Sequence, residues 1–128
     1  MDKSQILSAF NNHFEEFVND VQRVFPNNKD IATVVGLIGT VRKANPRLVI
    51  KAFQEHFIGK YRAQIESGDI NFFIDNDYKA DVASLGASSS ILDKIDCLRE
   101  PVRAMNKADQ DNVVKYMQNL TKLADMYA

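Results

Sequence analysis

The chain has 128 residues, of which 45% are hydrophobic and 26% are charged, and its formal net charge is −1. This length and composition are typical of one globular domain with its own core, and they exclude an intrinsically disordered chain. The near-zero net charge excludes a global attraction to nucleic acid or acidic lipid, so any electrostatic function has to come from a local surface.

Cysteine content and hydropathy indicate where such a protein works. The single cysteine, Cys97, excludes a disulfide within the chain and fits a reducing compartment, although it leaves an intermolecular bridge open. Charged residues appear too early in the N-terminal segment for a signal peptide, and no apolar run approaches the roughly 18 residues of a membrane span. We therefore expect an intracellular protein that is not secreted and has no membrane span.

Apolar residues recur at helical spacing from the start of the chain. The first stripe predicts a helix over residues 4–25, which the following proline should end because proline disfavours helical geometry in its predecessor. A second stripe predicts a helix over 31–41 with Asn27 as its N-cap. Gly36 and Gly39 weaken this second helix unless a neighbouring helix packs closely against them.

The third predicted helix begins at an Asn-Pro pair. We expect Asn45 to be its N-cap, with the proline at the first helical position, where a missing N–H costs nothing. The helix should run over 46–67 and end with Gly68 at its C-terminus. Its expected core stripe consists of Val49, Ile50, Phe53, Phe57, Tyr61 and Ile65.

The middle of the chain is the least regular part of the sequence. Asp69 can cap a short helix that carries the apolar residues of 70–74. The following segment, 75–90, is polar and contains a glycine and three consecutive serines. This composition predicts a mobile loop.

The last part of the chain returns to helical spacing. A stripe over 91–105 contains Pro101, which should either kink the helix or split it after Arg99. Asn106 should cap the final helix. No stretch shows the sustained alternation of a strand. The sequence therefore predicts an all-α protein, a single compact bundle of five to six helices that uses residues 1–128 as one domain.

One acidic segment, Asp75 to Asp81, superficially suggests a calcium loop. An EF-hand needs oxygen ligands at positions one, three and five, glycine at position six and glutamate at position twelve. The last three requirements fail here, so we reject an EF-hand. A solvated acidic loop is the simpler interpretation. The alternative left open is a looser cation site formed by Asp75, Asp77 and Asp81.

Residues for catalysis or metal binding are few and scattered. His13 and His56 are the only histidines, and together with Cys97 they offer no local pair at the spacing of a zinc site. Glycine-rich phosphate loops and a nucleophile elbow are absent from the sequence. We expect no catalytic, metal or cofactor site and therefore no enzyme. An enzyme stays possible only if folding gathers a histidine with carboxylates or with Cys97.

Charge is segregated in the middle of the chain. From Arg42 to Arg62 there are six basic residues and one acidic residue, a net charge of +5, and from Glu66 to Asp81 there are five acidic residues and one basic residue, a net charge of −4. These blocks predict two binding surfaces, unless both are ordinary solvated faces. The predicted basic patch consists of Arg42, Lys43, Arg47 and Lys51. The predicted acidic patch consists of Asp69, Asp75, Asp77 and Asp81.

Three segments carry a family resemblance: FNNHFEEFVNDVQRVFPNNKDI, VRKANPRLVI and KYRAQIESGDINFFIDNDY. They resemble small uncharacterised proteins of nucleocytoplasmic large DNA viruses that infect algae and other protists, the phycodnavirus and mimivirus type. The resemblance covers nearly the whole chain and is strongest in Arg42–Pro46 and Gly68–Tyr78. It transfers no catalytic residue. It implies a viral protein made in the reducing cytoplasm of a host cell.

Together, these observations favour a non-enzymatic helical interaction protein. The resemblance implies a structural or assembly component of a large virus particle, found in the host cytoplasm, in the virion or in both. Its partners would be proteins, including further copies of itself. The alternative is an accessory factor in viral transcription, replication or genome packaging that binds nucleic acid through the basic patch. Aromatic residues between the basic ones would favour single-strand binding, but they lie on the expected core stripe instead.

Overall fold

A computed structural model describes residues 2–71 and 98–127, except for the side chains of residues 56, 57 and 60. These residues form six α-helices, one π-helical turn and no strand, in a compact bundle, which confirms the predicted all-α fold. The helices are α1 (Lys3–Val24), α2 (Lys29–Ala44), α3 (Leu48–Phe53), α4 (Gly59–Ser67), α8 (Arg99–Ala104) and α9 (Lys107–Tyr127), and the π-helical turn (Gln54–Ile58) lies between α3 and α4.

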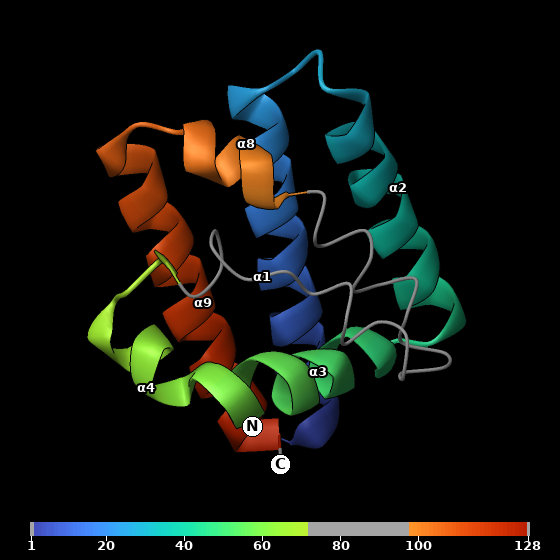
Figure 1. The fold of residues 1–128 in the computed structure, drawn as a ribbon. Helices are drawn as coiled ribbons and strands as arrows, with labels where there is room; N and C mark the ends of the chain where they lie inside the picture. Colours follow the sequence, from blue (N-terminus) through green and yellow to red (C-terminus); the bar gives the residue numbers. More distant parts are fainter. Residues whose placement is uncertain (1, 72–97, 128) are drawn as a thin grey trace.

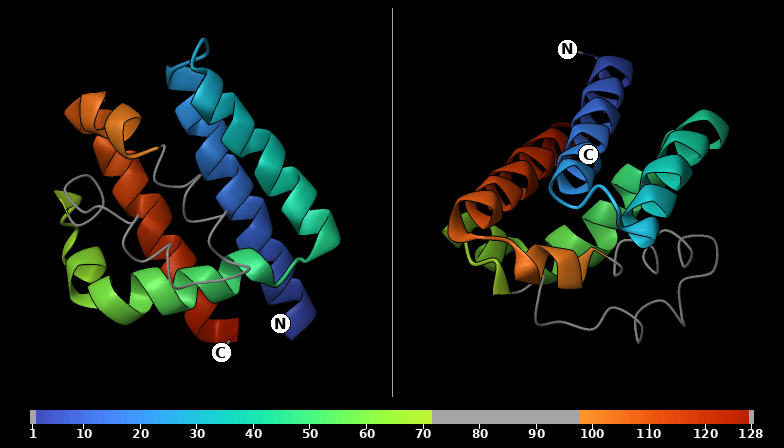
Figure 2. Two further views of the ribbon diagram at one scale, coloured as in Figure 1. Left: turned by 45° about the vertical axis from the view of Figure 1, so that its right-hand side comes forward. Right: turned by 90° about the horizontal axis from the view of Figure 1, so that it is seen from above.

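The helices are arranged in two layers (Figure 1). In one layer α1 lies between α2 and α9 and contacts both of them. The α3–α4 segment crosses one end of this layer, and α8 lies on the same face at the other end (Figure 2). The core fills the space between the layers because each helix turns its apolar stripe inward. Its largest fully buried side chains are Phe10, Phe17, Ile31, Ile50, Ile65, Leu98 and Leu120.

The N-cap of the second helix lies one residue later than the sequence predicts. Asn28, and not Asn27, is the N-cap of α2: its Oδ1 accepts hydrogen bonds from the backbone N–H of Asp30 (2.9 Å) and of Ile31 (3.1 Å). Two consecutive asparagines offer the same cap chemistry, and the turn that follows α1 decides which of them is used.

Close packing does not explain the two glycines of α2. Among the described residues, and apart from the backbone of α2 itself and the neighbours in sequence, no atom lies within 4 Å of the position that a Cβ would take at Gly36 or at Gly39. The helix forms in spite of them because Ile31, Val34 and Ile38 are buried against the rest of the bundle.

The prediction that Asn45 caps the third helix is wrong. Asn45 ends α2 instead: its N–H donates to the carbonyl of Val41 (2.7 Å). Its own carbonyl accepts from the N–H of Leu48 (3.1 Å), which closes a turn through Pro46. Helix α3 therefore starts at Leu48, and Arg47 precedes it without any side-chain capping bond.

A π-helical turn interrupts the α-helix that the sequence predicts over 46–67. The N–H of Gly59 donates to the carbonyl of Gln54, five residues earlier. One additional residue in this turn places Ile58, five residues after the buried Phe53, in the core. The sequence predicted Phe57 in this stripe, and its side chain lies outside the described part, whereas the predicted Val49, Ile50, Phe53 and Ile65 are buried.

The predicted end of the α4 helix is confirmed. Gly68 has a φ of +79°, in the left-handed region where glycine carries no steric penalty. Its N–H donates to the carbonyl of Ile65 (3.2 Å), and that of Asp69 donates to Gln64 (2.9 Å). These two bonds form a Schellman motif, which satisfies the last carbonyls of the helix.

Several predictions fall on residues 72–97, outside the described part of the chain. They are the mobile loop over 75–90, most of the helix expected at 70–74 and the beginning of the stripe over 91–105. Asp69 does accept a bond from the N–H of Asn71 (2.9 Å), as a capping residue should.

The C-terminal helices correct one prediction and confirm another. Pro101 is the third residue of α8, in the first turn, where backbone N–H groups have no helical partner. Helix α8 runs from Arg99 to Ala104 without a break, so the split expected directly after Arg99 is wrong. The kink offered as the other possibility for the stripe over 91–105 depends on residues before 98, outside the described part. Asn106 does precede α9, and its Oδ1 accepts from the N–H of Asp109 (2.9 Å).

Candidate functional site

Three basic side chains are exposed where α2 ends and α3 begins. We call Lys43, Arg47 and Lys51 the cationic corner. Lys43 lies in the last turn of α2, and the backbone bond from Lys51 to Arg47 (3.1 Å) places those two residues one helical turn apart. The sequence between Asp30 and Glu55 contains no acidic residue, so the nearest carboxylate along the chain is that of Glu55, four residues after Lys51.

The cationic corner makes no ion pair within the described residues, a property that it shares with several isolated lysines. By contrast, Arg62 contacts Asp125 (2.8 Å), and Arg103 contacts Glu100 (3.5 Å). The charge of the corner is therefore available to a partner, whereas these other charges are compensated within the chain.

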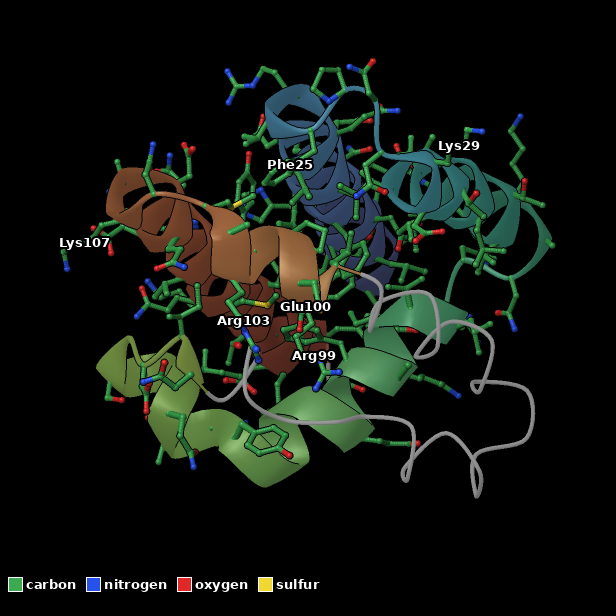
Figure 3. The ribbon with its side chains drawn as sticks, turned by 45° about the horizontal axis from the view of Figure 1, so that its top comes forward. Phe25, Lys29, Arg99, Glu100, Arg103 and Lys107 are labelled. Atoms are coloured by element: carbon green, nitrogen blue, oxygen red, sulfur yellow. The ribbon has the colours of Figure 1, made fainter. Side chains whose placement is uncertain are left out.

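Lys3, Lys29, Lys107, Lys115 and Lys122 also make no ion pair within the described part, and two of them, Lys29 and Lys107, lie at the opposite end of the molecule. Figure 3 shows them at the starts of α2 and α9, on the end that carries Phe25 and α8. They are separated from each other and have the acidic neighbours Asp30 and Asp109. They do not form a second cationic surface, and they are suitable control positions.

Arg47 occupies a position where a positive charge is locally unfavourable. It directly precedes α3, and the N-terminus of a helix carries a partial positive charge from its unpaired N–H groups. Serine, threonine, aspartate or asparagine is preferred there because such side chains accept bonds from those N–H groups. Arg47 makes no such bond and no ion pair within the described residues. A residue that opposes local stability without a structural gain is a candidate for function.

The fourth member of the predicted basic patch is held against α1. Nη1 of Arg42 donates to Oδ1 of Asn12 (2.7 Å) and lies 3.3 Å from Oε2 of Glu15. The Arg42 side chain is only 28% exposed. The structure therefore places Arg42 beside the cationic corner but joins it to α1.

Little of the predicted acidic patch lies within the described residues. Asp69 is exposed and accepts a backbone bond from Asn71, so its carboxylate has a local capping role. The other three members, Asp75, Asp77 and Asp81, lie outside the described residues, and so does the looser cation site that they would form.

Of the two histidines and the cysteine, only His13 has a side chain within the described part. His13 is half-buried on α1, its Nδ1 lies 3.4 Å from Glu16, and its ring centre lies 4.8 Å from that of Tyr116. Its Nε2 is buried without a hydrogen-bond partner. The His56 side chain and Cys97 are not described. Among the described residues, no three histidine, cysteine or acidic side chains are grouped as a metal site requires.

Two polar contacts between distant parts of the chain were missed by the sequence analysis. The Tyr116 hydroxyl donates to Asp20, and burial together with this bond raises the pKa of Tyr116 to about 12. Both Nη atoms of Arg62 donate to Asp125 (2.9 and 2.8 Å), which lowers the pKa of that carboxyl. The first contact joins α1 to α9 and the second joins α4 to α9, so both stabilise the packing of helices. No local sequence signal reveals either pair.

Comparison of the chain with protein-family models, with curated proteins and with solved structures finds no match. In the part of the chain that the structure describes, no helix combines the length and apolar character needed to cross a bilayer. The functional proposal below therefore rests on the cationic corner itself.

Proposed function

We propose that this protein is a non-enzymatic helical interaction protein that uses the cationic corner to bind an acidic surface of a partner protein. One observation carries the proposal: Arg47 is exposed and unpaired within the described residues at a helix start that disfavours its charge. Lys43 and Lys51 extend this charge on both sides. Negative charge on a partner would offset the repulsion between Arg47 and the positive N-terminal end of α3, and it would orient the two protein surfaces.

The size of the corner favours a protein partner over nucleic acid. Nucleic-acid binding gains most of its affinity from many phosphate contacts, and about six to ten are typical of proteins with strong salt dependence. The cationic corner offers three cations on a chain with a net charge of −1. Nucleic-acid binding stays the second candidate because these cations are unpaired, and it would correspond to the accessory-factor role.

The biological setting that we propose is the particle of a large DNA virus, in which the protein is a structural or assembly component. The family resemblance supports this setting, and one of its two strongest segments, Arg42–Pro46, lies at the cationic corner. Quantitative mass spectrometry of purified particles tests it. A fixed copy number relative to the major capsid protein is expected. Absence from particles together with abundance in infected cells would instead favour the accessory factor.

Charge reversal tests the binding surface. The double variant Arg47→Glu/Lys51→Glu should bind fluorescent poly-L-glutamate at low salt about tenfold more weakly, because two exposed attractions become repulsions. The control is Lys29→Glu/Lys107→Glu, which makes the same change in net charge at the other end of the molecule. Binding by the control should stay within about twofold of the wild type, since its positions lie beyond the roughly 10 Å screening length of the corner.

The binding results distinguish an acidic protein partner from nucleic acid. Equal losses in both variants would mean that net charge matters and the corner does not. Absence of binding to poly-L-glutamate with retained binding to a DNA duplex would favour the nucleic-acid role. For that role, three phosphate contacts predict a log–log salt slope of about −2.7. Absence of binding to either polymer would reject the cationic corner as a docking surface.

A further inference from the structure

Arg42 lies beside the cationic corner and is oriented by residues of another helix. We infer that Arg42 is a fourth binding cation, which Asn12 and Glu15 of α1 hold in position to receive a carboxylate of the partner. This inference rests on the proposed function. It makes Asn12 and Glu15 positioning residues: they act on the partner through the orientation of Arg42.

The contacts of the Arg42 guanidinium leave one of its edges free. A guanidinium has five N–H donors, spread over Nη1, Nη2 and Nε. The hydrogen bond to Asn12 comes from Nη1, the same atom that lies near Glu15. Within the described residues, Nη2 and Nε of Arg42 donate no hydrogen bond. These two atoms form the edge that binds a carboxylate through two parallel bonds.

Part of the Arg42 side chain reaches the surface. The Arg42 side chain is 28% exposed, so it is neither buried in the core nor fully solvated. Arg42 and Lys43 both lie in the last turn of α2, so the backbone of Arg42 is next to the cationic corner while its side chain points toward α1. A partner seated on the corner would therefore reach Arg42 without any movement of α1 or α2.

The attachment of Arg42 to α1 favours binding because it restricts the rotamers of the Arg42 side chain before the partner binds. A long side chain that is ordered only on binding loses rotamer freedom at that moment, which weakens the complex. Asn12 and Glu15 have already ordered Arg42. Glu15 is itself 34% exposed, so solvent screens its attraction for Arg42 and leaves the guanidinium able to attract a second carboxylate.

The alternative is that these contacts only fasten α1 to α2. The variant Asn12→Ala separates the two interpretations because it removes the 2.7 Å contact without changing net charge. Asn12 is exposed, so the truncation creates no cavity. The matched control is Asn119→Ala, at an exposed asparagine of α9 whose side chain makes no hydrogen bond within the described residues.

Binding to poly-L-glutamate and guanidinium NMR provide the two measurements. We expect Asn12→Ala to weaken binding about fivefold, the effect of one ordinary hydrogen bond, and Asn119→Ala to leave it unchanged. The Arg42 guanidinium resonance should show restrained rotation in the wild type and in Asn119→Ala, and free rotation in Asn12→Ala. Arg42→Lys, which keeps the charge but loses the planar edge, should weaken binding at least as much as Asn12→Ala.

Each failure has a distinct meaning. If the wild type binds poly-L-glutamate and the corner variant does not, but Asn12→Ala and Arg42→Lys bind normally, Arg42 is a structural clamp and the inference is wrong. Restrained rotation that persists in Asn12→Ala would show that Asn12 does not orient the arginine. If the wild type binds only the DNA duplex, or neither polymer, the proposed function fails first and the carboxylate role of Arg42 fails with it.

Discussion

At the residue scale, the same type of side chain has different roles according to what surrounds it. Arg42, Arg47 and Arg62 all belong to the basic block of the sequence. Arg62 is neutralised by Asp125, Arg42 is joined to α1 through Nη1 alone, and Arg47 makes no ion pair within the described residues. A count of charges along the chain therefore overestimates the cationic surface, because it cannot show which charges are compensated in space.

Substitution of Arg47 tests whether this residue lowers the stability of the fold while it supports binding. Replacing Arg47 by Asp should raise the free energy of unfolding by about 0.5–1 kcal/mol, because a negative charge is favourable at the start of a helix. The same variant should bind poly-L-glutamate more weakly. Urea denaturation and fluorescence anisotropy measure the two effects.

Lys51→Asp is the control for this prediction. It makes the same change in charge within the same helix, but one turn further from the helix start, where the stabilising effect has faded. Its binding should fall without a gain in stability. If Arg47→Asp is less stable than the wild type, Arg47 makes a structural contribution and the conflict does not exist.

At the scale of the element, glycine has opposite effects at two positions. Gly68 requires its φ of +79° to close the Schellman motif after α4. Gly36 lies within α2 at ordinary helical geometry, and apart from the backbone of α2 and the neighbours in sequence no atom of the described residues lies within 4 Å of the position of a Cβ. The first glycine is required by the backbone conformation, and the second weakens its helix.

These glycines predict opposite changes in stability for the same substitution. Gly36→Ala should stabilise the protein by about 0.5–1 kcal/mol, because alanine loses less backbone entropy in a helix. Gly68→Ala should destabilise it by about 1–2 kcal/mol, because a Cβ is strained in the left-handed region. Thermal and urea unfolding of both variants check the prediction. Destabilisation by Gly36→Ala would show that a contact absent from this structure needs the glycine.

At the scale of the whole molecule, the aromatic residues of α1 join the two layers of helices. Phe10 is fully buried, and its ring meets that of Phe53 in an edge-on contact with centres 5.6 Å apart. Phe14 and Phe17 continue this aromatic stripe along α1. Helix α1 therefore holds the bundle together through contacts with both layers.

Removal of this aromatic contact should destabilise the whole bundle. Phe10→Ala is expected to lower the free energy of unfolding by about 3–5 kcal/mol, through lost burial and the cavity that it leaves. The control Met126→Ala, at a side chain that is 52% exposed, should change it by less than about 0.5 kcal/mol. Urea denaturation of both variants measures the difference. Similar losses in the two variants would contradict this assignment of the core.

The sequence by itself determined the class of the fold and most helix positions in the described residues. Helices are local: the spacing of apolar residues defines their buried faces, and residues such as Asn106 and Gly68 mark their ends within a few positions. The sequence also located the cationic corner, because Lys43, Arg47 and Lys51 lie within one short segment.

Only the tertiary structure decided the features that depend on distant neighbours or on subtle backbone geometry. The pairing of Arg42 with Asn12 spans 30 positions, and that of Tyr116 with Asp20 spans 96. The choice of Asn28 over Asn27 as a cap and the π-helical turn before Gly59 depend on how the chain has to turn between packed helices. Periodicity carries no information about such contacts, because they arise from the packing of one helix against another.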